Sequence, residues 1–390
     1  MMRVKLGDIC EINPKRTPED LDMNVSFIPM QRVSDQGDID TSDIRSIKEV
    51  CKGFTAFVDG DILMAKITPC MENGKGAIAS GLHNGIGYGS TEFHVLRPNQ
   101  DLVRSSWIYY FTIEKLFRLN CEKNMTGSAG QKRVPKSYLQ GYPIPLPSLA
   151  EQDMKIATLD RLRQIIILYK SQLQKLDDLV KARFVEMFVK KDVMEDWPEK
   201  KIMDISTDMR TGPFGSALLH DEFVDSGIFV LGIDNAVENK FSYNRMRYIT
   251  EEKYQQLKRY TVNPDDVIIT IMGTVGRSAV IPRNIPRAIN TKHLACITLD
   301  RDQANPYFLS CAFQIHPVIR TQLQKQSKGA IMDGLNLTII KRLSFSLPPI
   351  DLQEQFVDFY NQIDKSKAAV QQALDKTQQL FDSLMQQYFA

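Results

Sequence analysis

The stretch IPLPSLAEQ at residues 144–152 places a short strand-like run, a proline-rich junction and the start of a helical segment next to one another. About two hundred residues later, FSLPPIDLQEQ at residues 345–355 repeats the same order. Proline supplies no backbone N–H and restricts the residue before it, so each junction ends one element before the next begins. The repetition predicts two copies of one unit, each a domain followed by a helix.

Both junctions carry a helix-start signal. Ser148 with Glu151, and Asp351 with Glu354, match the capping-box pattern, in which the first side chain accepts a free backbone N–H and the glutamate reaches back. The second junction has two extra residues before its Glu-Gln pair. We therefore expect helices that begin at residues 148 and 351.

Apolar residues in both helical segments recur at alternating steps of three and four, which is the seam of a coiled coil. In the first segment the seam is Leu159, Leu162, Ile166, Tyr169, Leu173, Leu176 and Val180. In the second it is Phe356, Phe359, Ile363, Ser366, Val370, Ala373, Thr377, Leu380 and Leu384. A helix of about 38 residues spans roughly 57 Å, which favours a pair of helices packed on each other over two separate core helices.

Further blocks align at an offset near two hundred residues. KLGDIC (5–10) matches KIMDIS (201–206), GDILMAKI (60–67) matches DDVIITIM (265–272), and NGKGAIA (73–79) matches VGRSAVI (275–281). Strand-like runs at 61–67 and 266–272, and short helical stretches at 105–117 and 305–314, predict an α+β fold. The chain is thus expected to be a tandem duplication.

Composition sets broad limits. The 390 residues are 43% hydrophobic and 25% charged, which is ordinary for a globular protein of two to three domains. The sequence shows no run of 18 apolar residues and no signal-peptide pattern at its start. Its six scattered cysteines predict reduced thiols in the cytoplasm, and neither they nor the five histidines have zinc-site spacing. Net charge is only +2, yet residues 273–292 hold four basic residues and no acid.

These residues resemble a known family. Two variable domains, each followed by a long helix introduced by a PLP-x-L-x-EQ junction, resemble the specificity (S) subunit of type I restriction–modification enzymes. The marks are the two junctions, KITPCMENGKGAI (66–78), GPFGS (212–216) and GTVGR (273–277). The resemblance covers essentially the whole chain and implies target-recognition domains at 1–147 and 192–350, with conserved helices at 148–191 and 351–390.

The resemblance also implies a function. Such a subunit is not catalytic: each target-recognition domain reads one half of a split DNA sequence, and the helices form an antiparallel coiled coil that fixes the unread spacer. Two methyltransferase subunits dock on it and methylate adenine N6 with S-adenosylmethionine. Restriction subunits, which use ATP and Mg²⁺, complete the complex. Two similar domains with an approximate two-fold axis suit half-sites about one helical turn apart, and their divergence predicts an asymmetric target.

Candidate DNA contacts lie on loops that combine glycine with polar or basic side chains. TGSAGQKRVP (126–135) offers Gln131 for a base edge and Lys132 and Arg133 for phosphate or guanine, and the matching SKGAIMDGLN (327–336) offers Lys328 and Asn336. Glycine turns that permit close approach to phosphates carry Lys75 in one half and Thr274 and Arg277 in the other.

Other candidates follow predicted strands and carry groups suited to base edges. These are Gln31, Arg32, Asp234, Asn235, Ser90, Thr91, Asn290, Thr291 and Lys292. For all of these loops the alternative is an ordinary solvated turn.

Catalytic motifs are weak in this sequence. NPYF (305–308) lacks the second proline of the Asn-Pro-Pro-Tyr/Phe motif of adenine methyltransferases, and a helix cap explains Asn305. NGIGYG (84–89) is not followed by a helix, and Asp61 with Lys66 lacks the Glu-x-Lys of metal-dependent nucleases. A stand-alone methyltransferase or nuclease is the alternative function, and a recognition module of another methylation-dependent defence system is a third.

Overall fold

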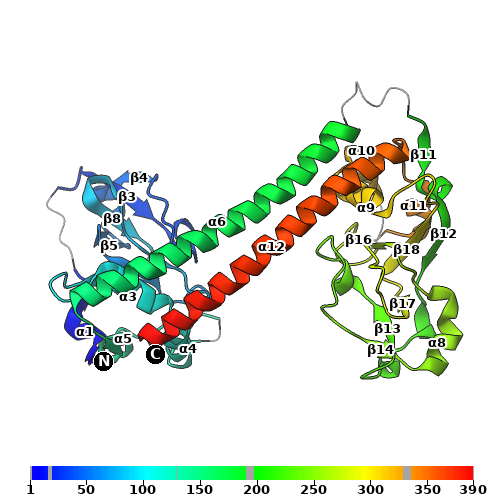
Figure 1. The fold of residues 1–390 in the computed structure, drawn as a ribbon. Helices are drawn as coiled ribbons and strands as arrows, with labels where there is room; N and C mark the ends of the chain where they lie inside the picture. The colour runs from blue at the N-terminus through cyan, green and yellow to red at the C-terminus, as the bar shows by residue number, and fades with distance from the viewer. Residues whose placement is uncertain (1, 16–19, 129, 190–196, 328–334, 390) are drawn as a thin grey trace. The chain divides into compact units, whose positions relative to one another are not determined.

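The computed structural model describes residues 2–15, 20–128, 130–189, 197–327 and 335–389. The chain divides into two compact units (Figure 1). The first unit comprises Met1–Lys170 with Gln371–Ala390, and the second comprises Ser171–Val370. Each unit therefore holds one α+β domain together with about half of each of two long helices, α6 (Leu149–Phe188) and α12 (Ile350–Phe389).

The first unit contains three small sheets. Every strand pair is antiparallel except β3–β8. Their orders are β1–β10, β2–β9–β6–β7 and β4–β3–β8–β5. The strands are β1 (Arg3–Lys5), β2 (Cys10–Ile12), β3 (Asn24–Ile28), β4 (Ile44–Ser46), β5 (Thr55–Val58), β6 (Ile62–Ala65), β7 (Gly76–Ile78), β8 (Ile86–Gly89), β9 (Phe93–Pro98) and β10 (Pro143–Pro145).

The second unit repeats this topology, except that its third sheet has three described strands where that of the first unit has four. Its sheets run β11–β19, β12–β18–β15–β16 and β14–β13–β17, and β13–β17 is again the parallel pair. The strands are β11 (Glu199–Lys201), β12 (Ser206–Thr211), β13 (Ile228–Leu231), β14 (Tyr248–Ile249), β15 (Val267–Thr270), β16 (Ser278–Val280), β17 (Ala288–Asn290), β18 (Leu294–Leu299) and β19 (Ser344–Ser346). The predicted α+β duplication is confirmed.

Short helices also recur in corresponding places. The first unit has α1 (Leu6–Ile9), α2 (Ile47–Val50), α3 (Ser105–Ile113), α4 (Lys115–Lys123) and α5 (Lys136–Gly141). The second has α8 (Glu251–Leu257), α9 (Pro306–Ile315), α10 (Pro317–Ser327) and α11 (Leu337–Arg342). No helix in the described part of the chain is both long enough and apolar enough to span a membrane.

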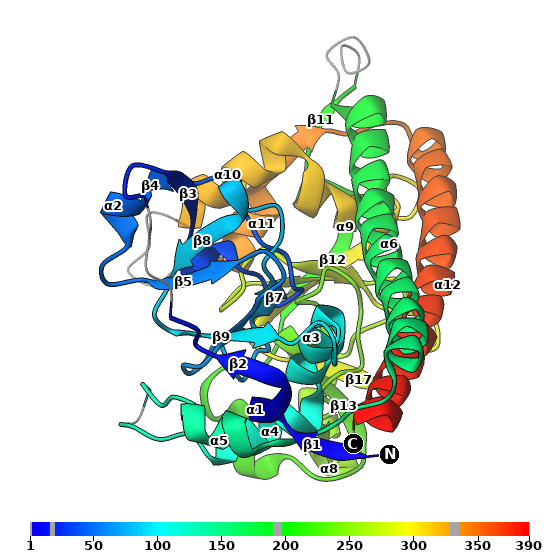
Figure 2. The ribbon, with the colours of Figure 1, turned by 90° about the vertical axis from the view of Figure 1, so that its left-hand side faces the viewer.

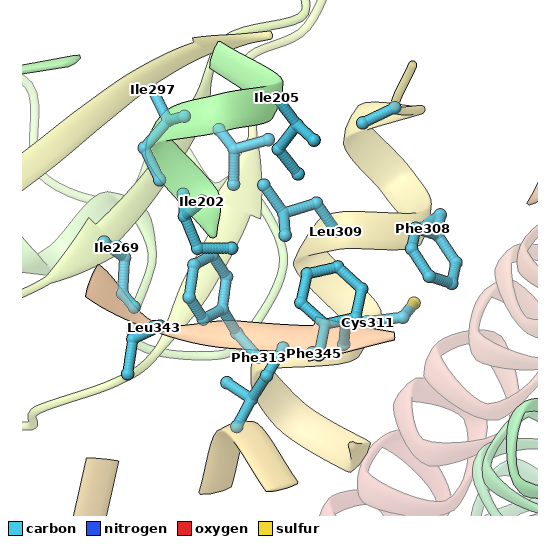
Figure 3. Close-up of a cluster of buried hydrophobic side chains, with 14 of the residues drawn as sticks. Ile202, Ile205, Ile269, Ile297, Phe308, Leu309, Cys311, Phe313, Leu343 and Phe345 are labelled. Atoms are coloured by element: carbon cyan, nitrogen blue, oxygen red, sulfur yellow. The ribbon is translucent and has the colours of Figure 1, made fainter. Parts of the chain in front are cut away.

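The central strands β6 and β15 are apolar except for Thr270 because both of their faces are covered. In β6, Ile62 and Met64 belong to a core cluster that includes Trp107 of α3, whereas Leu63 and Ala65 belong to a second cluster. The corresponding strand β15 is divided in the same way between two clusters. Figure 3 shows one of them, in which side chains of α9 and the sheet point toward one another.

The start of α6 follows the predicted capping box. The Ser148 backbone N–H donates to the Glu151 carboxylate at 3.0 Å, and the Ser148 hydroxyl accepts from the Glu151 backbone at 3.4 Å. The predicted capping box of Asp351 and Glu354 at the start of the second helix is wrong. Because α12 begins at Ile350, Asp351 lies inside its first turn, and Pro349 accepts the first backbone hydrogen bonds.

The two long helices run antiparallel within each unit. In the first unit, Lys155 near the start of α6 lies 5.1 Å from the ring centre of Tyr388 near the end of α12. In the second unit, Phe184 near the end of α6 packs edge-on against Phe356 near the start of α12, with ring centres 5.3 Å apart. Figure 2 shows the pair side by side in a second view.

The seam of α6 is confirmed, since each of its predicted members is buried or half-buried. The seam of α12 is wrong at two positions. Ser366 and Leu380 are exposed, Leu380 by 50%, and their neighbours Lys367 and Phe381 face inward instead. Lys367 pairs with Asp177 of α6, and Phe381 packs on Tyr110 of α3. Contacts with α6 at one position and with α3 at the other therefore shift the buried face of α12 by one residue at both.

Candidate nucleic-acid interface

The loops predicted to contact DNA in the first half of the chain lie together. The backbone N–H of Thr68 donates to the Lys132 carbonyl at 3.1 Å, and that of Val134 donates to the Lys66 carbonyl at 2.9 Å. These bonds join the β6–β7 loop to the glycine-rich loop 126–133. Sequence order alone does not reveal this pairing, because the two loops are about sixty residues apart.

Two more predicted segments join the same group. The Lys75 ammonium donates to the Met30 carbonyl at 3.3 Å, next to the predicted pair Gln31 and Arg32. The backbone N–H of Ser90 donates to the Ile28 carbonyl at 3.3 Å, which brings residues 90–92 to the same edge. We call residues 30–32, 66–75, 90–92, 126–128 and 130–133 the first loop cluster.

Within the first loop cluster, some of the residues predicted to contact DNA are exposed, and others form ion pairs inside the protein. Gln131 and Lys132 are exposed. Arg133 instead forms a bidentate pair with Glu92, with N–O distances of 2.9 and 2.7 Å, and this hydrogen bond lowers the pKa of the Glu92 carboxyl. The pair fastens loop 126–133 to the residue just before strand β9, so Arg133 positions its neighbours.

Arg32 is engaged in a similar way. Its guanidinium pairs with Asp40 and donates to the Ser42 hydroxyl at 2.9 Å. Lys66 is a half-buried member of the cluster, and burial lowers the pKa of its ammonium. The predicted side chains that are exposed in the first loop cluster are those of Gln31, Thr91, Gln131 and Lys132, and Lys75 and Ser90 beside them are half-buried.

The second unit has a corresponding group. The Thr291 backbone N–H donates to the Leu231 carbonyl at 3.1 Å, and the Leu335 N–H donates to the Ile271 carbonyl at 2.9 Å. Gly212 lies so close to Thr291 that a Cβ added to it would meet the Thr291 carbonyl carbon at 2.2 Å. We call residues 212–216, 233–235, 271–277, 290–293 and 335–336 the second loop cluster.

Arg277 is the most accessible cation of the second loop cluster. It is exposed on the β15–β16 turn, where Gly273 and Gly276 have φ of 71° and 81°, a conformation that favours glycine. Its backbone N–H donates to the Thr270 hydroxyl at 2.9 Å, which fixes the turn. Its side chain makes no ion pair with any described residue. Thr274 is exposed on the same turn.

Two asparagines of the second loop cluster are interior residues, and we correct the prediction for them. Asn235 is fully buried; its amide oxygen accepts from the Gly232 N–H at 2.8 Å, and its NH₂ donates to the Ser242 carbonyl at 2.7 Å. Asn290 is also fully buried and donates to the Leu294 carbonyl at 3.2 Å. Neither amide has a surface to offer to a base edge.

The remaining predicted residues divide as follows. Asp234 pairs with Arg247 at 2.6 Å. Asn336 caps α11 by accepting the Ile339 N–H at 2.9 Å. Thr291 and Lys292 are half-buried at the end of β17, and Lys328 lies outside the described residues.

Sequence reasoning missed one exposed aromatic. Phe214 is 55% exposed in the turn 212–216, whose first residue packs on Thr291 of the second loop cluster. An exposed ring beside a basic loop can stack on a nucleobase. The available signal was the pattern Gly-Pro-Phe-Gly, since a phenylalanine inside a tight turn has no core to enter.

Two motifs that resemble catalytic motifs in sequence have structural roles. Asn305 is the N-cap of α9, and its side chain accepts the Tyr307 N–H at 3.0 Å. Asp61 is buried and forms a bidentate pair with Arg97, at 2.8 and 2.7 Å. In the second unit the corresponding Asp266 pairs with Arg210, which lies on β12 and not on β18, the counterpart of β9.

Comparison with known proteins is consistent with this arrangement. Residues 1–178 and 194–378 match the family described as type I restriction modification DNA specificity domain. The EcoAI specificity subunit of Escherichia coli is 45% identical over 161 residues, which is 41% of this chain and 27% of that relative. The EcoBI specificity subunit of Escherichia coli is 26% identical over 292 residues, or 68% of this chain and 61% of that relative.

Two solved structures share the fold. One, from work on complex assembly and conformational transition of the type I R-M system, has a TM-score of 0.62, 16% identity and coverage of 99% of this chain and 97% of its own. The other, a type I restriction–modification S subunit from M. genitalium, has a TM-score of 0.60, 14% identity and coverage of 100% and 96%.

Proposed function

We propose a function from one premise: the chain belongs to the type I restriction–modification DNA specificity family. It recognises a bipartite DNA sequence and carries out no catalysis itself. Each α+β domain reads one half-site through its loop cluster, and the α6–α12 pair sets the number of unread bases between the half-sites.

One observation carries this proposal. Loops that are far apart in sequence converge at the same place of the same sheet topology in both units, and each cluster offers different side chains. The first presents Gln131 and Lys132, and the second presents Arg277 and Thr274. Because the side chains exposed in the two clusters differ, the two half-sites should differ.

Membership of the family supports a proposal for the partners. Two methyltransferase subunits dock on the chain and use S-adenosylmethionine to methylate adenine N6, and restriction subunits that need ATP and Mg²⁺ complete the complex. We place the complex in the cytoplasm, where the six free cysteines of this chain stay reduced.

The direct test compares the purified chain with the reconstituted complex. The chain alone should bind DNA and transfer no methyl group. Addition of the methyltransferase subunit encoded with it should give adenine methylation, with two such subunits per chain in native mass spectrometry. Methyl transfer by the isolated chain that survives repurification would contradict the proposal.

Arg277 and Gln131 should have separable roles in binding. Arg277→Ala removes an exposed cation that makes no ion pair with a described residue, so binding should weaken on every sequence and the log–log salt slope should fall by about one. Gln131→Ala removes an amide suited to adenine and should cost about 1–3 kcal/mol on the proper target only, relaxing the first domain's half-site. Binding is measured across a salt series on the target and on single-base variants.

Arg283→Ala is the matched control. Arg283 belongs to the same basic stretch but lies at the opposite end of the β15–β16 hairpin, where it pairs with Asp265 at 3.4 Å. It should leave the salt slope unchanged. If Gln131→Ala weakened all sequences equally while Arg277→Ala altered base preference in the second half-site, the two roles would be reversed.

A further inference from the structure

A buried glutamine joins the first domain to its helix. Gln152 of α6 is fully buried, and its amide makes three hydrogen bonds to backbone groups. The amide oxygen accepts the Arg104 N–H at 2.9 Å, and the NH₂ donates to the carbonyls of Leu102 and Pro147, at 3.1 and 2.9 Å. The side chain thus connects α6 to the segment before α3 and to the proline junction.

The second domain has the same connection. Gln353 of α12 is fully buried; it accepts the Asn305 N–H at 2.9 Å and donates to the carbonyls of Gln303 and Pro348, at 3.0 and 2.8 Å. Every partner occupies the position that corresponds to its partner in the first unit. We call Gln152 and Gln353, with their three backbone partners each, the glutamine clamps.

The clamps show that the second junction contains no insertion. Gln353, and not Gln355 of the Glu-Gln pair, corresponds to Gln152, and Gln355 is exposed. An alignment that matches the two Glu-Gln pairs therefore places the second junction two residues out of register with the structure. The chain offers in Gln355 a matched control about half a helical turn away from the clamp glutamine.

The chemistry of the clamp makes the angle between domain and helix specific. A buried amide is stable only when its donors and acceptor are all satisfied, and a tilt of the helix would separate several hydrogen bonds at once. An apolar side chain of similar size could fill the same space without selecting one angle. The hydrogen bonds of the clamp thus select one angle between domain and helix, whereas apolar packing alone would allow a range of angles.

The two units depend on their clamps to different degrees. In the first unit, further polar contacts brace the domain on α6: Arg104 pairs with Asp153 at 2.9 Å, Tyr110 donates to Asp160 at 2.5 Å, and Arg163 donates to the Gln36 carbonyl. In the part of the second unit that the structure describes, the ion pair of Lys240 with Asp364 at 2.8 Å joins the domain to α12. Because fewer described polar contacts join the second domain to α12, we expect Gln353 to contribute more than Gln152 to the angle between domain and helix.

We propose that Gln152 and Gln353 are positioning residues that set how strictly the spacer length of the DNA target is read. This inference rests on the proposed function. A domain held at one angle accepts one distance between half-sites, whereas a domain that tilts on its helix accepts neighbouring distances. Loss of the second clamp should relax the spacer more than loss of the first.

The experiment uses the complex of the full chain with its methyltransferase subunits. Methylation rates are measured on the natural target and on targets with one base pair more or fewer in the spacer, for wild type, Gln152→Met, Gln353→Met and Gln355→Met. Methionine keeps the volume and removes the hydrogen bonds. The preference of the wild type for the natural spacer should fall about tenfold in Gln353→Met, less in Gln152→Met, and not at all in Gln355→Met.

The readouts separate this inference from the proposed function. A spacer preference in Gln353→Met equal to that of wild type, with only a lower melting temperature, would overturn the inference and leave the proposed function standing. A wild-type complex that methylates no bipartite target would overturn both. Should Gln353→Met not assemble, Gln353→Glu, which keeps the acceptor for Asn305 and loses both donors, is expected to relax the spacer in the same way.

Discussion

Four residues inserted into both long helices should lengthen the spacer of the methylated target by one or two base pairs and leave both half-sites unchanged. The insertions follow residue 172 of α6 and residue 372 of α12, points equally far in sequence from the paired Asp177 and Lys367. Four residues add about 6 Å of rise and turn the helix face by about 40° beyond a full turn. One base pair adds about 3.4 Å and turns DNA by roughly 35°, so both translation and rotation favour this small change.

The measurement is the sequence motif at methylated adenines in DNA exposed to the complex. Insertion into α6 alone is the control. It makes the two paired helices unequal in length and disrupts their packing, so we expect that complex to lose activity. An unchanged spacer with full activity after the paired insertion would show that the helices do not set the distance.

Replacement of His316 by phenylalanine should stabilise the second unit, most strongly in mild acid. His316 ends α9, is 1% exposed, and packs with its ring centre 5.7 Å from that of Phe345; neither ring nitrogen has a hydrogen-bond partner among the described residues. Burial lowers its pKa to about 4. The unfolded chain therefore binds a proton below about pH 6.5 that the folded unit does not, and stability falls as the pH drops from there toward 4.

That single group should cost the second unit about 2 kcal/mol between about pH 7.5 and about pH 5. His316→Phe should abolish this loss, in addition to a gain of about 1 kcal/mol at neutral pH from removing an unsatisfied buried polar ring. Hydrogen exchange of peptides from each unit measures both effects. Peptides of the first unit are the control, because their buried His94, whose pKa burial also lowers to about 4, is unchanged.

An equally steep loss of protection in the second unit of His316→Phe would contradict this assignment. The opposite sign, with the variant less stable at neutral pH, would mean that the larger ring does not fit between Phe184 and Phe345.

The duplication and the seam of α6 could be predicted because they depend on local periodicity. The steps from Leu159 to Val180 describe a face that buries itself wherever the helix packs, and the Ser148–Glu151 box involves only its own turn. Four consecutive apolar residues in β6 and a nearly unbroken apolar run in β15 likewise signal strands with both faces covered.

The sequence-based predictions are wrong where contacts between distant segments determine which side chains are buried. Lys367 and Phe381 replace Ser366 and Leu380 on the inner face of α12 because Asp177 and the ring of Tyr110 lie there, and neither is visible from the spacing in α12. Asn235 has the side chain of a base-reading residue, yet its amide closes a turn inside the domain.

Loop residues were predicted by type and not by arrangement. Gln131 and Arg133 are two positions apart in the sequence. Only the position of Glu92 in the fold shows that Arg133 is engaged in an ion pair, whereas the Gln131 side chain remains exposed. The role of Gln353 depends on backbone groups about fifty residues away in the sequence. From the sequence alone, Gln355 of the second Glu-Gln pair therefore appeared to be the counterpart of Gln152.

The central claim is that two diverged copies of one reading domain recognise two different half-sites at a fixed distance. A map of methylated adenines in the DNA of cells that express this chain with its methyltransferase subunit tests it most directly. We predict one motif made of two unlike short halves with a constant number of unread bases between them, absent when the chain is deleted. A continuous or palindromic motif, or methylation that persists without the chain, would contradict the account.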